Sequence, residues 1–367
     1  MKNKTKKWFI LLLVLGFIFT MSACSSGEND TSTNESAPAT GETENTDTPE
    51  NSAVAVEDSG ILGVYDQKPV PSLKGKTIGV SVIGTNKHLN SMFYKGTLDK
   101  IEELGGTAIG VDAEQNDQKR LSDLDNLLVQ KPDAIIGILG DAQVCAPSYK
   151  KISEAGIPIV TILMDTPYCV SNIDINNYEV GRDLAQSLFD KVGGEGKVAV
   201  FNGFYGVTVC GIRADMLYLV QKWQYPNIEF IEPELQDVMQ GTVEDARKKT
   251  QDLLTKYPPG SGLKVIYSTW DLASVGISQA IEESGRKDIF TAGVDGEPVA
   301  LDQVENSDSF LFTIANEPYK MGQKAAENVA KHLAGQDVPK TDYCPTLKVD
   351  DSNVAEARKI LFPDGAN

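Results

Sequence analysis

Apolar residues follow two spacings along the chain. Short runs rich in aliphatic and β-branched residues alternate with longer stretches whose apolar residues recur every three or four positions, as on one face of a helix. Several short runs, such as Ala134–Leu139, are apolar without interruption, which is typical of strands covered on both faces of a parallel sheet. The alternation predicts an α/β fold of repeated β-α-β units. We expect strands at Thr77–Gly84, Thr107–Asp112, Ala134–Leu139, Pro158–Met164, Lys197–Asn202, Glu229–Glu232, Lys264–Thr269, Ile289–Val294 and Phe310–Ala315.

The residues that follow each strand are the candidates for a site, because ligands bind beyond the carboxyl ends of strands in such sheets. Asp and Glu at these positions have a second interpretation as helix caps, and capping alone is the favoured one for Asp271 and Glu297. A large aromatic residue such as Trp270 at a strand end favours a ligand-facing role. The candidate ligand-binding residues are Asn86, His88, Asn90, Asp165, Tyr205, Arg213, Trp270, Asp295 and Asn316.

The first 24 residues have the form of an export signal, with several lysines, an apolar run from Trp8 to Phe19 and small residues before Cys24. The apolar run is shorter than the roughly 20 residues that a membrane-spanning helix needs. Met21–Cys24 resembles a bacterial lipobox, which implies a lipid on Cys24, and an ordinary secretory signal is the alternative. Residues 25–75 are predicted to be a disordered acidic tether, because polar residues dominate them up to about Asp58.

Charge and missing motifs narrow the possible functions. The chain has 34 Lys and Arg against 52 Asp and Glu, a net charge of -18, which argues against a nucleic-acid partner. It has only two histidines, and it lacks a phosphate-binding loop, a dinucleotide fingerprint and a nucleophile elbow. We therefore expect no enzymatic activity, no cofactor and no metal. Disulfide pairing is open for Cys145, Cys169, Cys210 and Cys344: a bridge between the first two and free buried thiols are both compatible with the sequence.

Four short segments together have the pattern of one family. They are Thr77–Val82 with Asn86 behind it, Asp112–Asn116, Gly156–Thr161 and Gly293–Gly296. From about Lys76 to Leu361 the chain resembles type I periplasmic binding proteins of the ribose and galactose class, the solute receptors of ABC importers. The resemblance implies that Asn86 is the first binding-loop Asn and that Asp295 binds a ligand hydroxyl.

The resemblance also implies two Rossmann-like lobes with parallel sheets, joined by a three-crossover hinge and holding the ligand between them. Carried over, lobe one is 76–176 plus 317–344, and lobe two is 177–316 plus 345–367. Ligand binding would favour the closed arrangement of such lobes. In this family the closed form is recognised by an ABC transporter permease, and we expect a monomer.

Departures from the family concern the ligand. His88–Asn90 replaces a Pro-Phe-Phe stretch, Gly211 stands where an Arg is expected although Arg213 matches the neighbouring one, and Asn316 replaces the hinge Gln. An arginine side chain can hold neighbouring hydroxyl groups through paired N–H donors. Because this chain has fewer arginines at these positions, a pentose bound in the manner of ribose is disfavoured. Asp165 and Asp295 beside Trp270 suit the hydroxyls of a polyol or sugar, and they equally suit an amine.

The sequence therefore predicts a lipid-anchored solute-binding protein of an ABC importer, on the extracellular face of the cell membrane, with a small sugar-like or polyol ligand. Two alternatives remain open. One is a receptor of the same fold for a cationic or other non-sugar solute, and the other is a sensor that presents its ligand-bound state to a membrane kinase.

Overall fold

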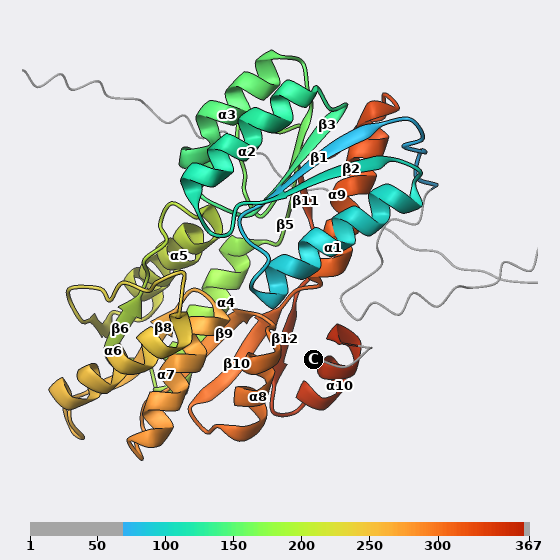
Figure 1. Ribbon diagram of the computed structural model, residues 1–367. Coiled ribbons are helices and arrows are strands. Elements are labelled where there is room, and N and C mark those ends of the chain that lie inside the picture. The colour runs from blue at the N-terminus through green and yellow to red at the C-terminus, as the bar shows by residue number, and fades with distance from the viewer. Residues whose placement is uncertain (1–68, 363–367) are drawn as a thin grey trace, which may run out of the picture. The chain divides into compact units, whose positions relative to one another are not determined.

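Two sets of strands organise residues 69–362, the part of the chain that the computed structural model describes (Figure 1). The first lobe contains one sheet with the strand order β11-β5-β4-β3-β1-β2, parallel throughout. Its strands are β1 (Thr77–Val82), β2 (Thr107–Asp112), β3 (Ala134–Ile138), β4 (Ile159–Ile162), β5 (Ser171–Asp174) and β11 (Thr341–Tyr343). Its helices are α1 (His88–Glu103), α2 (Asp117–Gln130), α3 (Ala142–Glu154) and α9 (Pro318–Leu333).

Both faces of the first sheet are buried, because successive side chains of a strand point to opposite faces. Ile136 and Ile138 pack into a hydrophobic cluster that includes residues of α1 and α9. Ile135, the residue before Ile136, packs into another cluster with residues of α2 and α3. The helices accordingly pack in two pairs, α1 with α9 and α2 with α3 (Figure 1). This arrangement explains why the run at residues 134–139 is apolar without interruption.

The second lobe has its strands in two hydrogen-bonded groups, β7-β6-β8 and β9-β10-β12. A parallel bridge between Val265 and Phe290 links the groups, and only the β10–β12 pair is antiparallel among the pairs of these groups. The strands are β6 (Glu195–Phe201), β7 (Asn227–Phe230), β8 (Leu263–Ser268), β9 (Thr291–Asp295), β10 (Phe310–Ala315) and β12 (Leu347–Asp350). The helices are α4 (Asn177–Lys191), α5 (Thr208–Gln224), α6 (Thr242–Lys256), α7 (Asp271–Glu283), α8 (Pro298–Asn306) and α10 (Val354–Leu361).

The predicted α/β fold is confirmed, and each of the nine expected strands overlaps a strand of the structure. The sequence patterns did not predict β5, β11 and β12, which are three or four residues long. In β5 the residues Ser171 and Asn172 are fully buried, and the Asn172 carboxamide oxygen accepts a hydrogen bond from the Thr161 hydroxyl at 3.0 Å. A short strand with a polar interior leaves no apolar run to detect.

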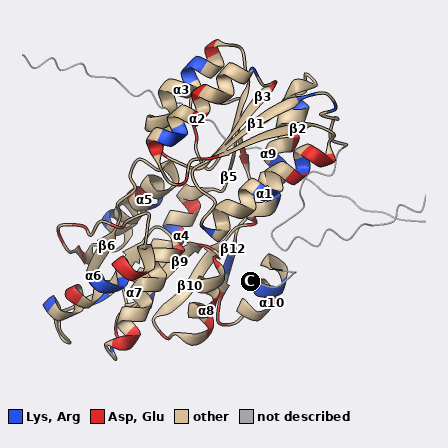
Figure 2. Cartoon of the chain, viewed as in Figure 1, with Lys and Arg blue, Asp and Glu red and all other residues tan. Residues whose placement is uncertain are grey.

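The predicted lobe boundaries stay a prediction, although the chain passes from one sheet to the other after β5, β10 and β11, near residues 176, 316 and 344. Cys24, the signal and residues 25–68 of the predicted tether lie outside the described residues. None of the helices within residues 69–362 is long and apolar enough to cross a membrane. In the same range Cys145, Cys169, Cys210 and Cys344 are buried free thiols. Lys, Arg, Asp and Glu residues lie mainly in the helices and loops of both lobes (Figure 2).

Candidate ligand-binding site

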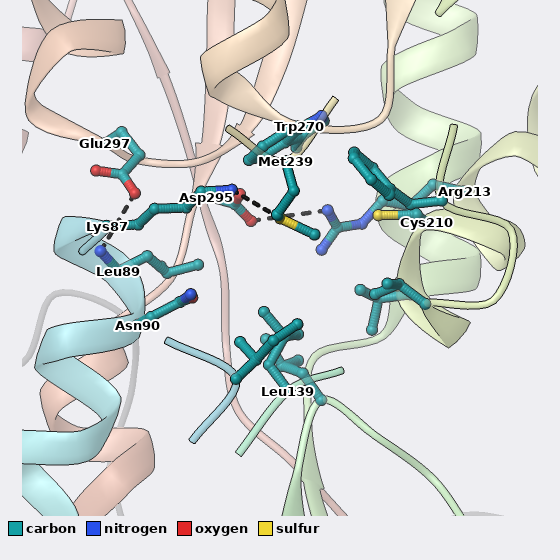
Figure 3. A pocket seen from close by; sticks show the side chains of 15 residues that line it. Lys87, Leu89, Asn90, Leu139, Cys210, Arg213, Met239, Trp270, Asp295 and Glu297 are labelled. Atoms are coloured by element: carbon teal, nitrogen blue, oxygen red, sulfur yellow. Dashed lines mark hydrogen bonds and ion pairs between the residues drawn. The ribbon is translucent and has the colours of Figure 1, made fainter. Parts of the chain in front are cut away.

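A cavity of about 50 Å³ lies where loops of the two lobes meet (Figure 3). The cavity is small, because a space of about 10–15 Å³ already holds one water molecule and this one therefore holds only a few. Residues after β1, β3 and β4 of the first lobe line it, together with residues after β6, β7 and β8 and at the end of β9 in the second. Its lining residues are Ile83, Lys87, Leu89, Asn90, Leu139, Leu163, Phe204, Val207, Val209, Cys210, Arg213, Met239, Trp270, Asp295 and Glu297.

Arg213 is fixed by hydrogen bonds from its Nε and Nη1 groups to other residues of the protein. It lies in α5 and is 1% exposed. Its Nε donates to the Asn177 side-chain oxygen at 2.7 Å, and its Nη1 donates to the Thr269 carbonyl at 2.9 Å and lies 3.7 Å from Asp295 Oδ1. Within residues 69–362, its buried Nη2 has no hydrogen-bond partner. A buried donor without a partner is costly, so Nη2 is suited to a ligand oxygen.

Asp295 ends β9 with a φ of 127°, a conformation that favours glycine and stores strain in other residues. The turn after it is fixed by Asp271, which is fully buried. Asp271 Oδ2 accepts hydrogen bonds from the backbone N–H groups of Gly296 and Glu297, each at 2.8 Å, and its Oδ1 accepts one from the Thr313 hydroxyl at 2.7 Å. Asp271 therefore shapes the loop that presents Asp295 and Glu297 to the cavity.

The capping interpretation is wrong for the side chains of Asp271 and Glu297. Asp271 bonds to the loop after β9, and Glu297, at the start of α8, makes no side-chain cap. Instead Glu297 Oε1 accepts a hydrogen bond of 3.2 Å from the Leu89 N–H at the start of α1 in the other lobe. Capping fails as an explanation because both carboxylates accept hydrogen bonds from backbone N–H groups of segments outside their own helices.

Burial raises the pKa values of both cavity carboxylates. The pKa of Asp295 rises to about 6, with Arg213 and Lys87 opposing the effect of burial, and the pKa of Glu297 rises to about 7. Burial also lowers the pKa of Lys87 to about 8, against the attraction of Asp295 and Glu297. The cavity thus contains two acids and two bases whose formal charges cancel when all four are ionised.

Trp270 is fixed from three sides. Its Nε1 donates to Asp237 Oδ2 at 2.7 Å, and its ring meets Phe204 edge to face with 5.8 Å between centroids. The Lys87 ammonium lies 4.2 Å from the centre of the same ring, within the range of a cation–π interaction. The lobes are therefore in contact around the cavity, since Lys87 belongs to the first lobe and Trp270 to the second.

The structure brings four of the predicted site residues to the cavity: Asn90, Arg213, Trp270 and Asp295. Five others are not among its lining residues, and their part in ligand binding stays a prediction. Asn86 accepts a hydrogen bond from Gln115, and His88 contacts Phe362. Asp165 is half exposed near Lys340, and Tyr205 donates a hydrogen bond to Glu234. Asn316 is buried beside β9, and its side chain has no hydrogen-bond partner within residues 69–362.

Sequence reasoning missed Lys87, Glu297, Cys210, Met239 and the apolar lining. One signal in the sequence could have found Lys87 and Glu297, and the same signal applies to Trp270. Lys87, Trp270 and Glu297 all stand at the N-cap positions of helices, α1, α7 and α8, and none makes a side-chain cap. Ser, Thr, Asp and Asn are preferred there, so other residue types at a strand end indicate a requirement beyond local stability. Met239, in the loop before α6, carries no such signal.

Known proteins share this architecture. A family model described as periplasmic binding protein domain matches residues 78–337. An ABC transporter solute-binding protein from Agrobacterium vitis, solved with bound allitol, has 40% identity and a TM-score of 0.76, and the match covers 78% of this chain and 99% of that one. The ribose import binding protein of Bacillus subtilis is 26% identical over 280 residues, 75% of this chain and 87% of that protein. The xylitol-binding protein of Mycolicibacterium smegmatis is 24% identical over 288 residues, 76% of this chain and 79% of that protein.

These relatives are binding proteins rather than enzymes, in agreement with the expectation from the sequence. The resemblance that the strand-end segments indicated is confirmed, because the matched region includes most of both lobes. The chain belongs to the periplasmic binding protein domain family.

Proposed function

We propose that this protein is the solute-binding component of an ABC importer and that its ligand is a small neutral polyol or sugar-like molecule. The observation that carries the proposal is the balance of the cavity: Lys87 and Arg213 oppose Asp295 and Glu297. A neutral ligand leaves that balance intact, whereas a charged ligand adds an uncompensated buried charge.

Hydroxyl groups fit this set of side chains because each one both donates and accepts a hydrogen bond. Carboxylate oxygens of Asp295 and Glu297 would accept from the ligand, and the free Nη2 of Arg213 would donate to it. The relatives support the same class, since one structure contains allitol and another relative is named for xylitol.

The lipid anchor and the membrane location are part of the proposal. The export signal, the lipobox-like Met21–Cys24 and the polar tether support attachment to the outer face of the membrane, where a permease of an ABC transporter would receive the ligand. Replacing Cys24 by Ser should release the protein from the membrane fraction into the medium. Retention of the Cys24→Ser protein on the membrane would contradict the anchor.

A thermal-shift panel tests the ligand class with the exported protein. It should contain allitol, xylitol, ribose, galactose, glycerol and an aliphatic amine. At a concentration of about 100 times the dissociation constant, a true ligand should add about 2.7 kcal/mol of stability. We expect this from a polyol or sugar, and we expect Trp270→Ala to abolish it. The variant should melt at a lower temperature without ligand, because the buried Asp237 loses the Nε1 donor, so each shift is measured against the unliganded form of the same variant. A shift with the amine alone would overturn the proposal.

A further inference from the structure

Lys87 is an unusual residue for its place in the chain. It stands at the N-cap of α1, where its side chain makes no cap hydrogen bond. Instead the side chain extends across the cavity toward Asp295 and Trp270 of the other lobe (Figure 3). The ammonium lies 4.2 Å from the Trp270 ring centre and donates a hydrogen bond of 2.9 Å to the Met239 sulfur.

An aromatic face with carboxylates beside it is the arrangement that proteins use to bind ammonium groups. Here the Trp270 ring faces the Lys87 ammonium, and Asp295 and Glu297 line the same cavity and attract that ammonium. Arg213 is the cation beside Asp295, at 3.7 Å, while Glu297 accepts a hydrogen bond from the Leu89 backbone. Without Lys87 the cavity would hold two acids and one base, so a further positive charge would be favoured there.

We propose that Lys87 is a specificity-determining residue that occupies the ammonium position of the cavity with the protein's own cation. It thereby excludes cationic ligands and directs donors at the hydroxyls of neutral ones. This inference rests on the proposed function, because it explains how the site selects a neutral polyol over an amine of the same shape.

Two further consequences follow from the geometry. The ammonium has three protons, and a thioether sulfur is a weak acceptor, so protons remain for ligand oxygens. The ammonium also covers part of a Trp270 face that a sugar ring would otherwise stack on. An open-chain polyol, which binds through its hydroxyls, is therefore favoured over a pyranose.

Titration calorimetry with three probes tests the inference: allitol, xylitol, and glucamine, an open-chain hexitol with a terminal ammonium group. The wild-type protein should bind a neutral polyol and reject glucamine. In Lys87→Met, which keeps an unbranched apolar side chain but loses the charge, polyol affinity should fall roughly 10- to 100-fold, as for a lost charged donor. Glucamine should then bind more tightly than the neutral polyols.

Lys95→Met is the matched control. Lys95 belongs to the same helix and its ammonium also faces an aromatic ring, that of Tyr319 at 5.3 Å, but it lies outside the cavity lining. Its replacement should change none of the three affinities. Lys87→Ala supplies a second variant: propylammonium, the part of the side chain that is removed, should restore polyol binding, and propanol should not.

The outcomes separate the two proposals. If the wild-type protein binds neither allitol nor xylitol, the polyol function fails, and the role of Lys87 is still decided by whether the variants gain affinity for glucamine or propylammonium. Wild-type binding of glucamine as tight as that of allitol would overturn the inference. So would a Lys87→Met protein that binds polyols normally and still rejects glucamine. If the Lys87 variants do not fold, the affinity of the wild-type protein for glucamine tests the inference alone: rejection of glucamine supports it, and binding of glucamine contradicts it.

Discussion

The two walls of the cavity differ in chemistry and in how they are held. The first-lobe wall is mostly apolar, with Ile83, Leu89, Leu139 and Leu163 around Lys87 and Asn90. The second-lobe wall has apolar residues too, among them Val207, Val209 and Met239, but it adds Trp270 and three charged side chains, those of Arg213, Asp295 and Glu297, and buried partners fix most of these four. Preorganised polar groups cost little further ordering when a ligand binds. The difference indicates that the second wall supplies most of the hydrogen bonds to the ligand, while the first wall covers it with apolar side chains and excludes cations through Lys87.

The largest effect should come from the second wall. Asp295→Asn removes the carboxylate that faces the cavity beside Arg213 and leaves the guanidinium without its nearby charge. We expect polyol affinity to fall about 100-fold or more, because a charged acceptor is lost and a buried cation loses its partner. Titration calorimetry with allitol and xylitol measures this loss of affinity.

Asp302→Asn is the control for this change, since Asp302 lies in α8 of the same lobe with its side chain 58% exposed. It should leave ligand affinity unchanged. Equal losses in the two variants would mean that the effect comes from the net charge of the lobe rather than from the wall.

An effect of comparable size, on stability, should follow from the support behind that wall. Asp271→Ala leaves the N–H groups of Gly296 and Glu297 and the Thr313 hydroxyl without their acceptor. Unfolding free energy should fall by about 2–4 kcal/mol, since each buried donor left without a partner costs about 1–3 kcal/mol and waters can enter in part. Urea denaturation measures this loss. An unchanged midpoint would show that the turn after β9 holds its shape without Asp271.

The stability of the protein should also depend on pH through Glu297. Glu297 has a pKa raised by burial to about 7 from an ordinary 4.5, so the folded state holds its proton more tightly than the unfolded chain does. Its contribution to stability is therefore fully present below about pH 4.5 and is lost as pH rises through about 7. The loss amounts to up to about 3 kcal/mol. Glu297→Gln should remove this part of the decline between pH 5 and pH 8.

Denaturation of the unliganded protein at several pH values compares the wild type with Glu297→Gln. Glu356→Gln, whose side chain is 66% exposed, is the matched control and should keep the wild-type profile. Identical pH profiles for the wild type and Glu297→Gln would show that Glu297 is ionised in the folded state at no cost, which contradicts the buried second wall.

The two walls also differ in how far the sequence predicted them. Arg213, Trp270 and Asp295 were found because polar or aromatic residues after parallel strands indicate a ligand-facing edge. The apolar residues of the first wall were missed, since Leu139 and Leu163 look like the ends of buried strands. Their φ angles of 48° and 54° turn the backbone there, and no apolar pattern reports such a turn.

The buried parallel sheets follow from uninterrupted apolar runs, which are typical of strands covered on both faces. The approach of one lobe to the other is different, because it depends on pairs far apart in sequence, such as Lys87 with Trp270 and Leu89 with Glu297. Spacing along the chain carries no information about such pairs.

The smallest effect should come from the apolar part of the first wall. Leu139→Ala removes apolar surface that is partly exposed to the cavity and breaks no hydrogen bond of its side chain. We expect polyol affinity to fall less than about tenfold, because the change removes at most three buried carbon groups at about 0.8 kcal/mol each and the ligand covers only part of them. The enlarged cavity should reduce the loss for allitol relative to the shorter xylitol. Calorimetry with both polyols checks this order. A loss for Leu139→Ala as large as that for Asp295→Asn would mean that the first wall recognises the ligand as closely as the second.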